Sequence, residues 1–318
     1  MEACLYGQGG FYSSGVGIAG RRGDFITSPE VGPLFGAVLA RRLDDAWVSL
    51  GNPDPFLVID AGTGPGTLLK SLELAAPGCA EAWQLLGVDR ATGVELPESL
   101  DGAVVVANEL LDNLVVRIVE RGADGWLELH VVPDPDDGRP VESLEHLDAA
   151  EADDLLARVP DLDRVAVGGR LPVHHAARAW VREVLDRGAS GLIAFDYGAP
   201  STLELVERGG WLRTYRGHER GDDPFAEPGA WDITVDIGFD QLPPKSRLVP
   251  QAEWLGDWGI DELVAEGRAY WDAHAAAPDL AAMRMRSRVN EAAALTDPSG
   301  LGGWWVAEWW RRRRASQP

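Results

Sequence analysis

The sequence has few of the features that disulfide-rich, metal-binding and membrane proteins require. Its 318 residues include only two cysteines, Cys4 and Cys79, and no CxxC motif, so we expect no disulfide framework. The six histidines show no ligand-like spacing with acids or cysteines, so we expect no metal site. Because there is no run of 18 apolar residues and no secretory-type N-terminus, we expect a soluble, cytoplasmic protein without membrane insertion.

Positive charge is scarce as well. The chain has 29 basic residues against 51 acidic ones, which gives a net charge of −22 at pH 7. A surface of this kind repels the phosphates of nucleic acids and anionic lipids, so we expect neither as a partner. It favours a cationic partner, such as a protein segment that carries an arginine, although solubility alone also explains an acidic surface. If the chain associates with itself, we expect a homodimer.

Short, solid apolar runs are frequent, and they are typical of strands that are buried on both faces. Such runs occur at residues 56–62, 82–89 and 102–113, with a helical pattern after the first, and residues 191–198 repeat the pattern. A strand, a helix and a strand at this spacing indicate a βαβ unit. We therefore predict an α/β fold with a mostly parallel, Rossmann-like sheet and helices on both faces.

The middle of the chain has a different pattern, which suggests an insertion. Residues 114–132 alternate in hydropathy across a Gly-Ala-Asp-Gly turn and predict a hairpin, and two helical stretches follow at about 147–159 and 174–188. The predicted division is residues 1–50 as an N-terminal loop and helix that contribute to the cleft, residues 51–113 and 190–318 as the cofactor-binding core, and residues 114–189 as an inserted hairpin and helical substrate region.

A glycine-rich loop follows the first buried strand, which ends in Asp60. Its glycines, Gly62, Gly64 and Gly66, have the spacing GxGxG. A dinucleotide-binding loop requires GxGxxG, and a phosphate-binding Walker loop requires Gly-Lys-Ser/Thr. Pro65 also removes one of the backbone amides that would bind a phosphate. The loop therefore suits a ligand that lies close to the backbone and has no phosphate group.

S-Adenosyl-L-methionine meets this description, because it has no phosphate and carries a positively charged sulfonium. Asp60 would favour the positive end of this cofactor. Asp89 lies at the tip of the next strand, 23 positions after Gly66, where a carboxylate can accept hydrogen bonds from both ribose hydroxyls. The alternative is a tight strand-to-helix turn that only packs the helix on the sheet. The acids on both sides of the loop favour the cofactor.

Polar residues that suit a methyl acceptor follow the third strand. These are Asn108, Glu109 and Asp112. The two acids are three positions apart, so on a helical turn they would share a face and could hold a guanidinium by charge-assisted hydrogen bonds. Methyl transfer then requires in-line alignment of the nitrogen, the methyl carbon and the sulfur. The alternative is that Asp112 caps a helix or turn while Glu109 pairs with an arginine.

Several sequence blocks carry a resemblance to a known family. They are GDFITSPEVGPLFG (23–36), DAGTGPGTLL (60–69), ANELLDNL (107–114), AFDYG (194–198), YRGH (215–218), DITVDIGF (232–239) and LTDPSGLGGWWVAEW (295–309). On these blocks the chain resembles the MidA-like methyltransferases, the family that includes the mitochondrial complex I assembly-factor arginine methyltransferase. The resemblance implies a class I methyltransferase fold and methylation of an arginine on a partner protein. It also implies that Gly23, Asp24 and Glu30 border the cofactor and acceptor cleft.

The chain departs from the family pattern in several places. The family has a helix and a further strand between the Asp89 strand and the ANE strand, and this stretch usually contributes contacts to adenine. Here residues 90–101 alone join the two strands, and twelve residues cannot hold both elements with their loops. Further departures are Val115, which stands where the family has a proline, and Asp236, which stands where the family has a histidine.

Three functions remain open from the sequence. The first is a protein arginine N-methyltransferase that uses S-adenosyl-L-methionine. The second is a non-catalytic assembly or binding protein with a degraded cofactor pocket, which the short connection at residues 90–101 favours. The third is a nicotinamide-dependent oxidoreductase, which the GxGxG spacing and Pro65 disfavour.

Overall fold

The computed structural model describes residues 1–7, 10–12, 27–157, 159–216, 219–221, 223–225 and 227–311. Two compact units are present. The central-sheet unit consists of Ala19–Glu109, Val184–Asp196 and Lys245–Pro318, and the insertion unit consists of Met1–Ile18, Leu110–Glu183 and Tyr197–Pro244. This division differs from the one predicted, because residues 197–244 group with the insertion rather than with the core.

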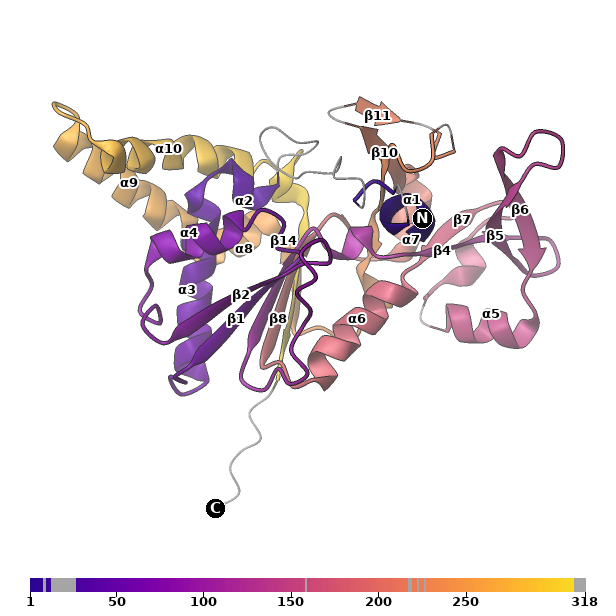
Figure 1. The fold of residues 1–318 in the computed structure, drawn as a ribbon, viewed down its shortest axis with the longest axis horizontal. Coiled ribbons are helices and arrows are strands. Elements are labelled where there is room, and N and C mark those ends of the chain that lie inside the picture. Colours follow the sequence, from indigo (N-terminus) through magenta and orange to yellow (C-terminus); the bar gives the residue numbers. More distant parts are fainter. Residues whose placement is uncertain are drawn as a thin grey trace, which may run out of the picture. The chain divides into compact units, whose positions relative to one another are not determined.

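The central-sheet unit contains a six-stranded sheet with the order β14-β15-β8-β3-β1-β2 (Figure 1). Its strands are β1 (Phe56–Ala61), β2 (Trp83–Val88), β3 (Val104–Asn108), β8 (Gly191–Asp196), β14 (Arg247–Pro250) and β15 (Trp305–Trp310). The first four are parallel to one another, whereas β15 runs antiparallel to both β8 and β14. The predicted α/β fold with a mostly parallel sheet is confirmed.

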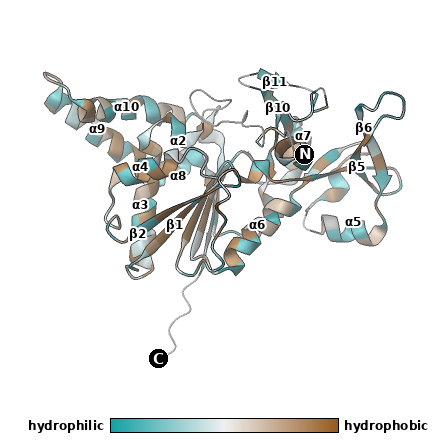
Figure 2. Cartoon of the chain, viewed as in Figure 1, coloured by the Kyte–Doolittle hydropathy of each residue, from teal (hydrophilic) through white to brown (hydrophobic). Residues whose placement is uncertain are grey.

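Helices of the same unit share an apolar core with this sheet. They are α2 (Ser28–Val31), α3 (Pro33–Ser49), α4 (Thr67–Ala75), α8 (Gln251–Asp257), α9 (Ile260–His274) and α10 (Leu280–Leu295), with a 3-10 turn at Leu301–Gly303. On α3, apolar residues recur at helical spacing, and Phe35 packs edge-on against Phe195 of β8 with ring centroids 5.0 Å apart. In Figure 2, brown marks the hydrophobic residues of the strands in this sheet.

The strand register places the predicted cofactor residues at one edge of this sheet. Asp60 lies beside Gly87 on β2 and Val106 on β3, and Asn108 lies beside Phe195. Because these four strands are parallel, their carboxyl ends meet at the same edge, where ligands bind in open α/β sheets. The predicted convergence of the ends of β1, β2 and β3 is therefore confirmed.

The connection after β2 is as short as the sequence indicates. Residues 90–101 contain no helix and no ladder strand, only single bridges that join Asp89 to Val94 and Asp101 to Ala189. The prediction that this segment cannot hold both a helix and a strand is confirmed. As a result, β2 forms the edge of the central sheet.

The insertion unit is built from smaller sheets. A four-stranded antiparallel sheet has the order β6-β5-β4-β7, a three-stranded one has the order β11-β10-β12, and β13 pairs with β9. The strands are β4 (Arg117–Arg121), β5 (Trp126–Pro133), β6 (Pro140–His146), β7 (Arg170–Val173), β9 (Gly198–Ala199), β10 (Leu212–Arg216), β11 (Glu219–Gly221), β12 (Asp232–Val235) and β13 (Ile237–Gly238). The predicted hairpin is confirmed as β4 and β5, with Gly122 N–H bonded to the Gly125 carbonyl at 2.8 Å.

Helices α1 (Glu2–Tyr6), α5 (Ala149–Leu156) and α7 (Thr202–Arg208) also belong to the insertion unit, with 3-10 turns at Leu111–Asn113, Leu162–Arg164 and Phe239–Gln241. Helix α6 (His175–Asp186) begins in this unit and ends in the other. Two helical stretches predicted from the sequence thus correspond to α5 and α6. Among the described helices, none combines the length and the hydropathy that a membrane span requires.

Candidate functional site

The glycine loop between β1 and α4 has a backbone that only glycine adopts readily. Gly62, Gly64 and Gly66 have φ angles of 76°, 49° and 72°, in the left-handed region. A Cβ atom built on Gly64 or Gly66 would meet no other atom within 4 Å. Gly66 is also the N-cap of α4. The loop therefore presents open backbone, as a ligand that lies against it requires.

Two acids hold this loop in place. The hydroxyl of Thr63 donates a hydrogen bond of 2.7 Å to Asp60 Oδ2. Asp89 accepts the amide N–H of Gly64 at 2.9 Å with one oxygen and that of Ala91 at 2.7 Å with the other. A carboxylate has about four lone-pair sites, so Asp89 keeps about two for the hydroxyls of a ligand.

Asp60 is charged only at an energetic cost. Its side chain is buried, and this burial raises its pKa from 3.8 to about 6, against the opposing hydrogen bond from Thr63. The negative charge of Asp89 raises the pKa further. A cationic ligand near this carboxylate would favour its charged form.

The raised pKa of Asp60 gives a prediction about stability. The folded state binds the proton more tightly than the unfolded state, so the free energy of unfolding falls as pH rises from about 4 to about 6. Asp60→Asn removes this pH dependence. The free energy of unfolding of the variant should therefore be higher than that of the native chain by about 1–3 kcal/mol at pH 7.5, and nearly equal to it near pH 4. Urea unfolding at both pH values measures the difference. A difference that is the same at both would contradict the assignment.

Asn108 ends β3 with a polar atom that lacks a partner. Its Nδ2 donates to Glu109 Oε1 at 3.0 Å, but its buried Oδ1 accepts no hydrogen bond in the structure. Leaving a buried acceptor unsatisfied costs about 1–3 kcal/mol, and a ligand that donates to Oδ1 would remove this cost. Glu109 itself has a left-handed backbone, with φ of 53°, and its N–H bonds to the Phe195 carbonyl at 2.9 Å.

The three residues expected from the family resemblance have different outcomes. Glu30 is buried in α2. This helix contacts α4, the helix that begins directly after the glycine loop. Gly23 and Asp24 lie outside the described residues. The role of Glu30 beside the cofactor stays a prediction.

Asp112 is the centre of a polar network in the insertion unit. It is only 2% exposed; the Tyr197 hydroxyl donates to its Oδ2, and Asn113 Nδ2 donates to its Oδ1 at 3.0 Å. Burial raises its pKa from 3.8 to about 6, which the Tyr197 hydrogen bond and the Arg213 charge oppose.

The local backbone corrects one premise about Asp112. The short 3-10 helix begins at Leu111 with Leu110 as its N-cap, and Glu109 precedes it with a left-handed backbone. The expectation that Glu109 and Asp112 share the face of one helical turn is therefore wrong. The division of the chain also falls between them, so Glu109 belongs to the central-sheet unit and Asp112 to the insertion unit.

Two tyrosines extend the network around Asp112. The Tyr12 hydroxyl lies 2.9 Å from Asn113 Oδ1 and 3.1 Å from Asp232 Oδ1. The Tyr6 hydroxyl donates to the Asn113 carbonyl at 2.9 Å, and the two tyrosine rings stack with centroids 5.6 Å apart. Sequence reasoning did not select Tyr12 or Tyr197. The sequence could have indicated Tyr197 as a site residue, because it directly follows a buried strand that ends in an acid.

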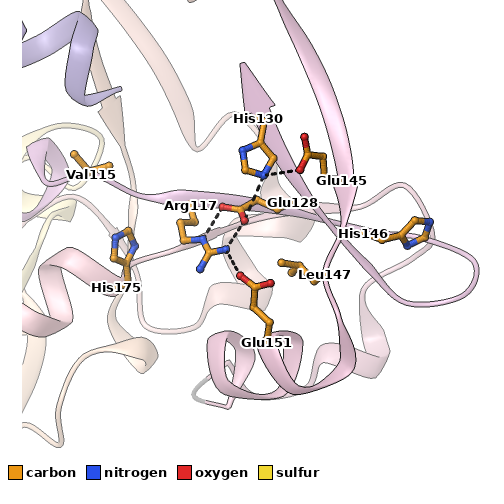
Figure 3. Close-up of a pocket in the computed structure, with 9 residues that line it drawn as sticks. All are labelled: Val115, Arg117, Glu128, His130, Glu145, His146, Leu147, Glu151 and His175. Carbon is orange, nitrogen blue, oxygen red and sulfur yellow. Dashed lines mark hydrogen bonds and ion pairs between the residues drawn. The ribbon is translucent and has the colours of Figure 1, made fainter. Parts of the chain in front are cut away.

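A pocket of about 500 Å³ lies elsewhere in the insertion unit (Figure 3). Arg117 is clamped there by both oxygens of Glu128, and its Nη2 donates to Glu151 Oε1 at 3.0 Å. This guanidinium lowers the pKa of Glu128. The remaining lining residues are Val115, His130, Glu145, His146, Leu147 and His175. None of the predicted site residues lines this pocket, and no group of side chains among the described residues could hold a metal ion.

The Arg117 clamp predicts a local stability effect. Glu128→Gln should lower the free energy of unfolding by about 1–3 kcal/mol, because the guanidinium loses its charged two-oxygen partner, a glutamate side chain that is only 12% exposed. Glu145→Gln is the matched control, since this glutamate side chain is 65% exposed. It should change stability by less than about 0.5 kcal/mol. Equal effects of the two substitutions in urea unfolding would refute this view of the clamp.

The fold and the site together define a class of protein. Four features fit S-adenosyl-L-methionine: the mostly parallel sheet, the open glycine loop, Asp89 at the tip of the adjacent strand, and the Asn108 Oδ1 atom that accepts no hydrogen bond. Residues 80–248, more than half of the chain, match the family described as "Putative S-adenosyl-L-methionine-dependent methyltransferase". The chain belongs to this family of S-adenosyl-L-methionine-dependent methyltransferases. The predicted family is confirmed.

Known relatives agree with this family. The chain is 23% identical over 281 residues to the "Protein arginine methyltransferase NDUFAF7 homolog, mitochondrial" of Drosophila melanogaster, covering 73% of this chain and 62% of the relative. It is 25% identical over 294 residues to the Mus musculus "Protein arginine methyltransferase NDUFAF7, mitochondrial", covering 76% and 65%. The chain thus spans less than two thirds of the length of these curated relatives.

A solved structure shows the same fold. It is a crystal structure of a Burkholderia thailandensis protein bound to S-adenosyl-homocysteine. The TM-score is 0.76 at 28% sequence identity, and the match covers 98% of this chain and 86% of that one.

These comparisons overturn the expected localisation. The sequence, which has no long apolar run, predicts a cytoplasmic protein. The curated relatives from fly, mouse and frog are named as mitochondrial proteins, so the cytoplasmic prediction is wrong.

Proposed function

We propose that this chain transfers a methyl group from S-adenosyl-L-methionine to a guanidinium nitrogen of an arginine on a partner protein. One observation carries the choice of acceptor: relatives that align with about three quarters of the chain are named protein arginine methyltransferases. The net charge of −22 supports a cationic partner.

We assign the cofactor-binding roles to the central-sheet unit. S-Adenosyl-L-methionine supplies an electrophilic methyl group when it is bound. The open backbone at Gly64 and Gly66 supports close approach of the cofactor, Asp89 has lone pairs left for the ribose hydroxyls, and Asn108 Oδ1 lacks a donor. Asp60, buried beside the loop, would favour positive charge nearby.

We assign the acceptor role to Asp112, with Glu109 and Asn108 as further candidates. A buried carboxylate accepts guanidinium N–H groups by charge-assisted hydrogen bonds, which fixes the orientation of the nitrogen that is to be methylated. Holding the positive charge of the guanidinium near one carboxylate also leaves electron density on the attacking nitrogen. The proton lost after transfer can pass to a carboxylate or to water.

Mass spectrometry of cellular proteins tests the acceptor. Cells that lack the gene are complemented with the native chain or with the Asp112→Asn variant, and methylated arginines are compared. We expect methylated arginines that disappear on deletion and return only with the native chain. Methylation that returns on lysine instead of arginine would contradict the proposed acceptor.

A non-catalytic binding protein is the second candidate. It is favoured by the 90–101 connection, which contains no helix and leaves β2 at the edge of the sheet, since the family pattern usually places adenine contacts there. No binding of S-adenosylhomocysteine at millimolar concentration would support this second function.

A further inference from the structure

A line of contacts in the insertion unit leads from Asp112 to a pair of arginines. The Tyr197 hydroxyl donates to Asp112, and the guanidinium of Arg213 lies over the Tyr197 ring, with its Cζ 4.8 Å from the centroid. Arg213 pairs with Asp236, and Arg208 Nη2 donates to the other Asp236 oxygen at 2.5 Å. Each side chain in this line is therefore fixed by the next one.

These contacts act on the charge state of Asp112 in opposite directions. Burial favours the neutral acid, and the negative charge of Asp236 adds to this effect. The Tyr197 hydrogen bond and the positive charge of Arg213 favour the carboxylate. Asn113 also donates to Asp112, and the negative charge of Asp112 raises the pKa of Tyr12. Tyr197 donates its hydroxyl to Asp112 from outside the 3-10 helix.

The stacked arginine explains how Tyr197 is kept in place. A guanidinium over an aromatic face is attracted by the negative potential of the ring, and this attraction grows when the pair is desolvated. Asp236 is only 4% exposed and anchors Arg213 from the position that follows β12. The ring of Tyr197 is thus held by an ion pair whose carboxylate is buried.

We propose that Tyr197, held by Arg213 and Asp236, is a positioning residue that keeps Asp112 oriented and ionised for binding the acceptor cation. This inference rests on the proposed acceptor role of Asp112. Tyr197 itself need not contact the acceptor. Its substitution should therefore shift the pH profile of methyl transfer. If the role of Tyr197 were purely structural, the rate would fall but the pH profile would keep its form.

The test compares Tyr197→Phe with the native chain and with Tyr270→Phe, a matched loss of a tyrosine hydroxyl on α9 of the other unit. Carbon-13 NMR of labelled aspartate carboxyl groups, assigned with Asp112→Asn, follows the titration of Asp112 without any substrate. The native midpoint should lie near 6. Tyr197→Phe should raise it by about one pH unit, which corresponds to the loss of one hydrogen bond to the carboxylate.

Methyl transfer gives the second readout. The acidic limb of kcat in Tyr197→Phe should move up by the same amount as the carboxyl midpoint, with most of the rate recovered above about pH 8. An unchanged Asp112 midpoint would overturn the inference, and so would a loss of rate that is equal at every pH. Because the carboxyl titration needs no substrate, a failure of arginine methylation alone is recognised separately by mass spectrometry.

Discussion

Asp112→Asn should lower the rate of methyl transfer by on the order of 100-fold or more while leaving the affinity for S-adenosylhomocysteine unchanged. Asparagine has the shape of aspartate, so the buried position and the hydrogen bond from Tyr197 can both persist. What is lost is the negative charge that would hold the guanidinium of the acceptor. Radiolabelled methyl transfer to a substrate identified by mass spectrometry measures the rate, and calorimetry measures the affinity.

Asp153→Asn is the matched control for Asp112→Asn. Asp153 is an exposed residue on α5 in the same unit, and its substitution changes the net charge by the same amount. It should leave both rate and affinity close to native. If Asp112→Asn weakens cofactor binding as much as it slows transfer, Asp112 has a structural role instead.

Gly66→Val should weaken the binding of S-adenosylhomocysteine by on the order of 100-fold, which corresponds to about 2.7 kcal/mol. The valine side chain would occupy the open space beside the loop backbone, and a β-branched residue is strained at the observed φ of 72°. Isothermal titration calorimetry on the variant and on the native chain measures the change.

The chain offers a control with almost the same backbone strain. Gly138 has φ of 74°, also has nothing within 4 Å of a Cβ, and lies in the turn between β5 and β6 of the other unit. Gly138→Val should cost similar stability without any loss of ligand affinity. If both variants bind the ligand equally well, the cofactor does not lie over the Gly62–Gly66 loop.

The sequence predicts the central sheet well because its signals are local. Solid apolar runs identify β1, β3 and β8, and the parallel arrangement places Asp60, Asp89 and Asn108 at one edge. The absence of a helix and a further strand from residues 90–101 is likewise predictable, because the number of residues in this connection is too small to hold both. The N-terminal helix predicted within residues 1–50 is divided in two, because Gly32 separates α2 from α3, which begins at Pro33.

The insertion unit is harder to predict because its contacts join distant parts of the chain. Strand β6 has the sequence PVESLEH, with charged residues on an exposed outer strand, so its hydropathy gives little signal. The hydrogen bond from Tyr197 to Asp112 spans 85 positions, and that from Tyr12 to Asp232 spans 220. No spacing rule connects such pairs. The false helical turn at residues 109–112 came from applying a local rule where the chain leaves one unit for the other.

Titration of S-adenosylhomocysteine into the native chain tests the central claim most directly, namely that a sulfonium cofactor is bound over the glycine loop. We expect saturable binding of one ligand per chain, with an affinity that falls by on the order of 100-fold on Gly66→Val and is kept on Gly138→Val. No heat and no thermal shift at millimolar ligand would contradict the account.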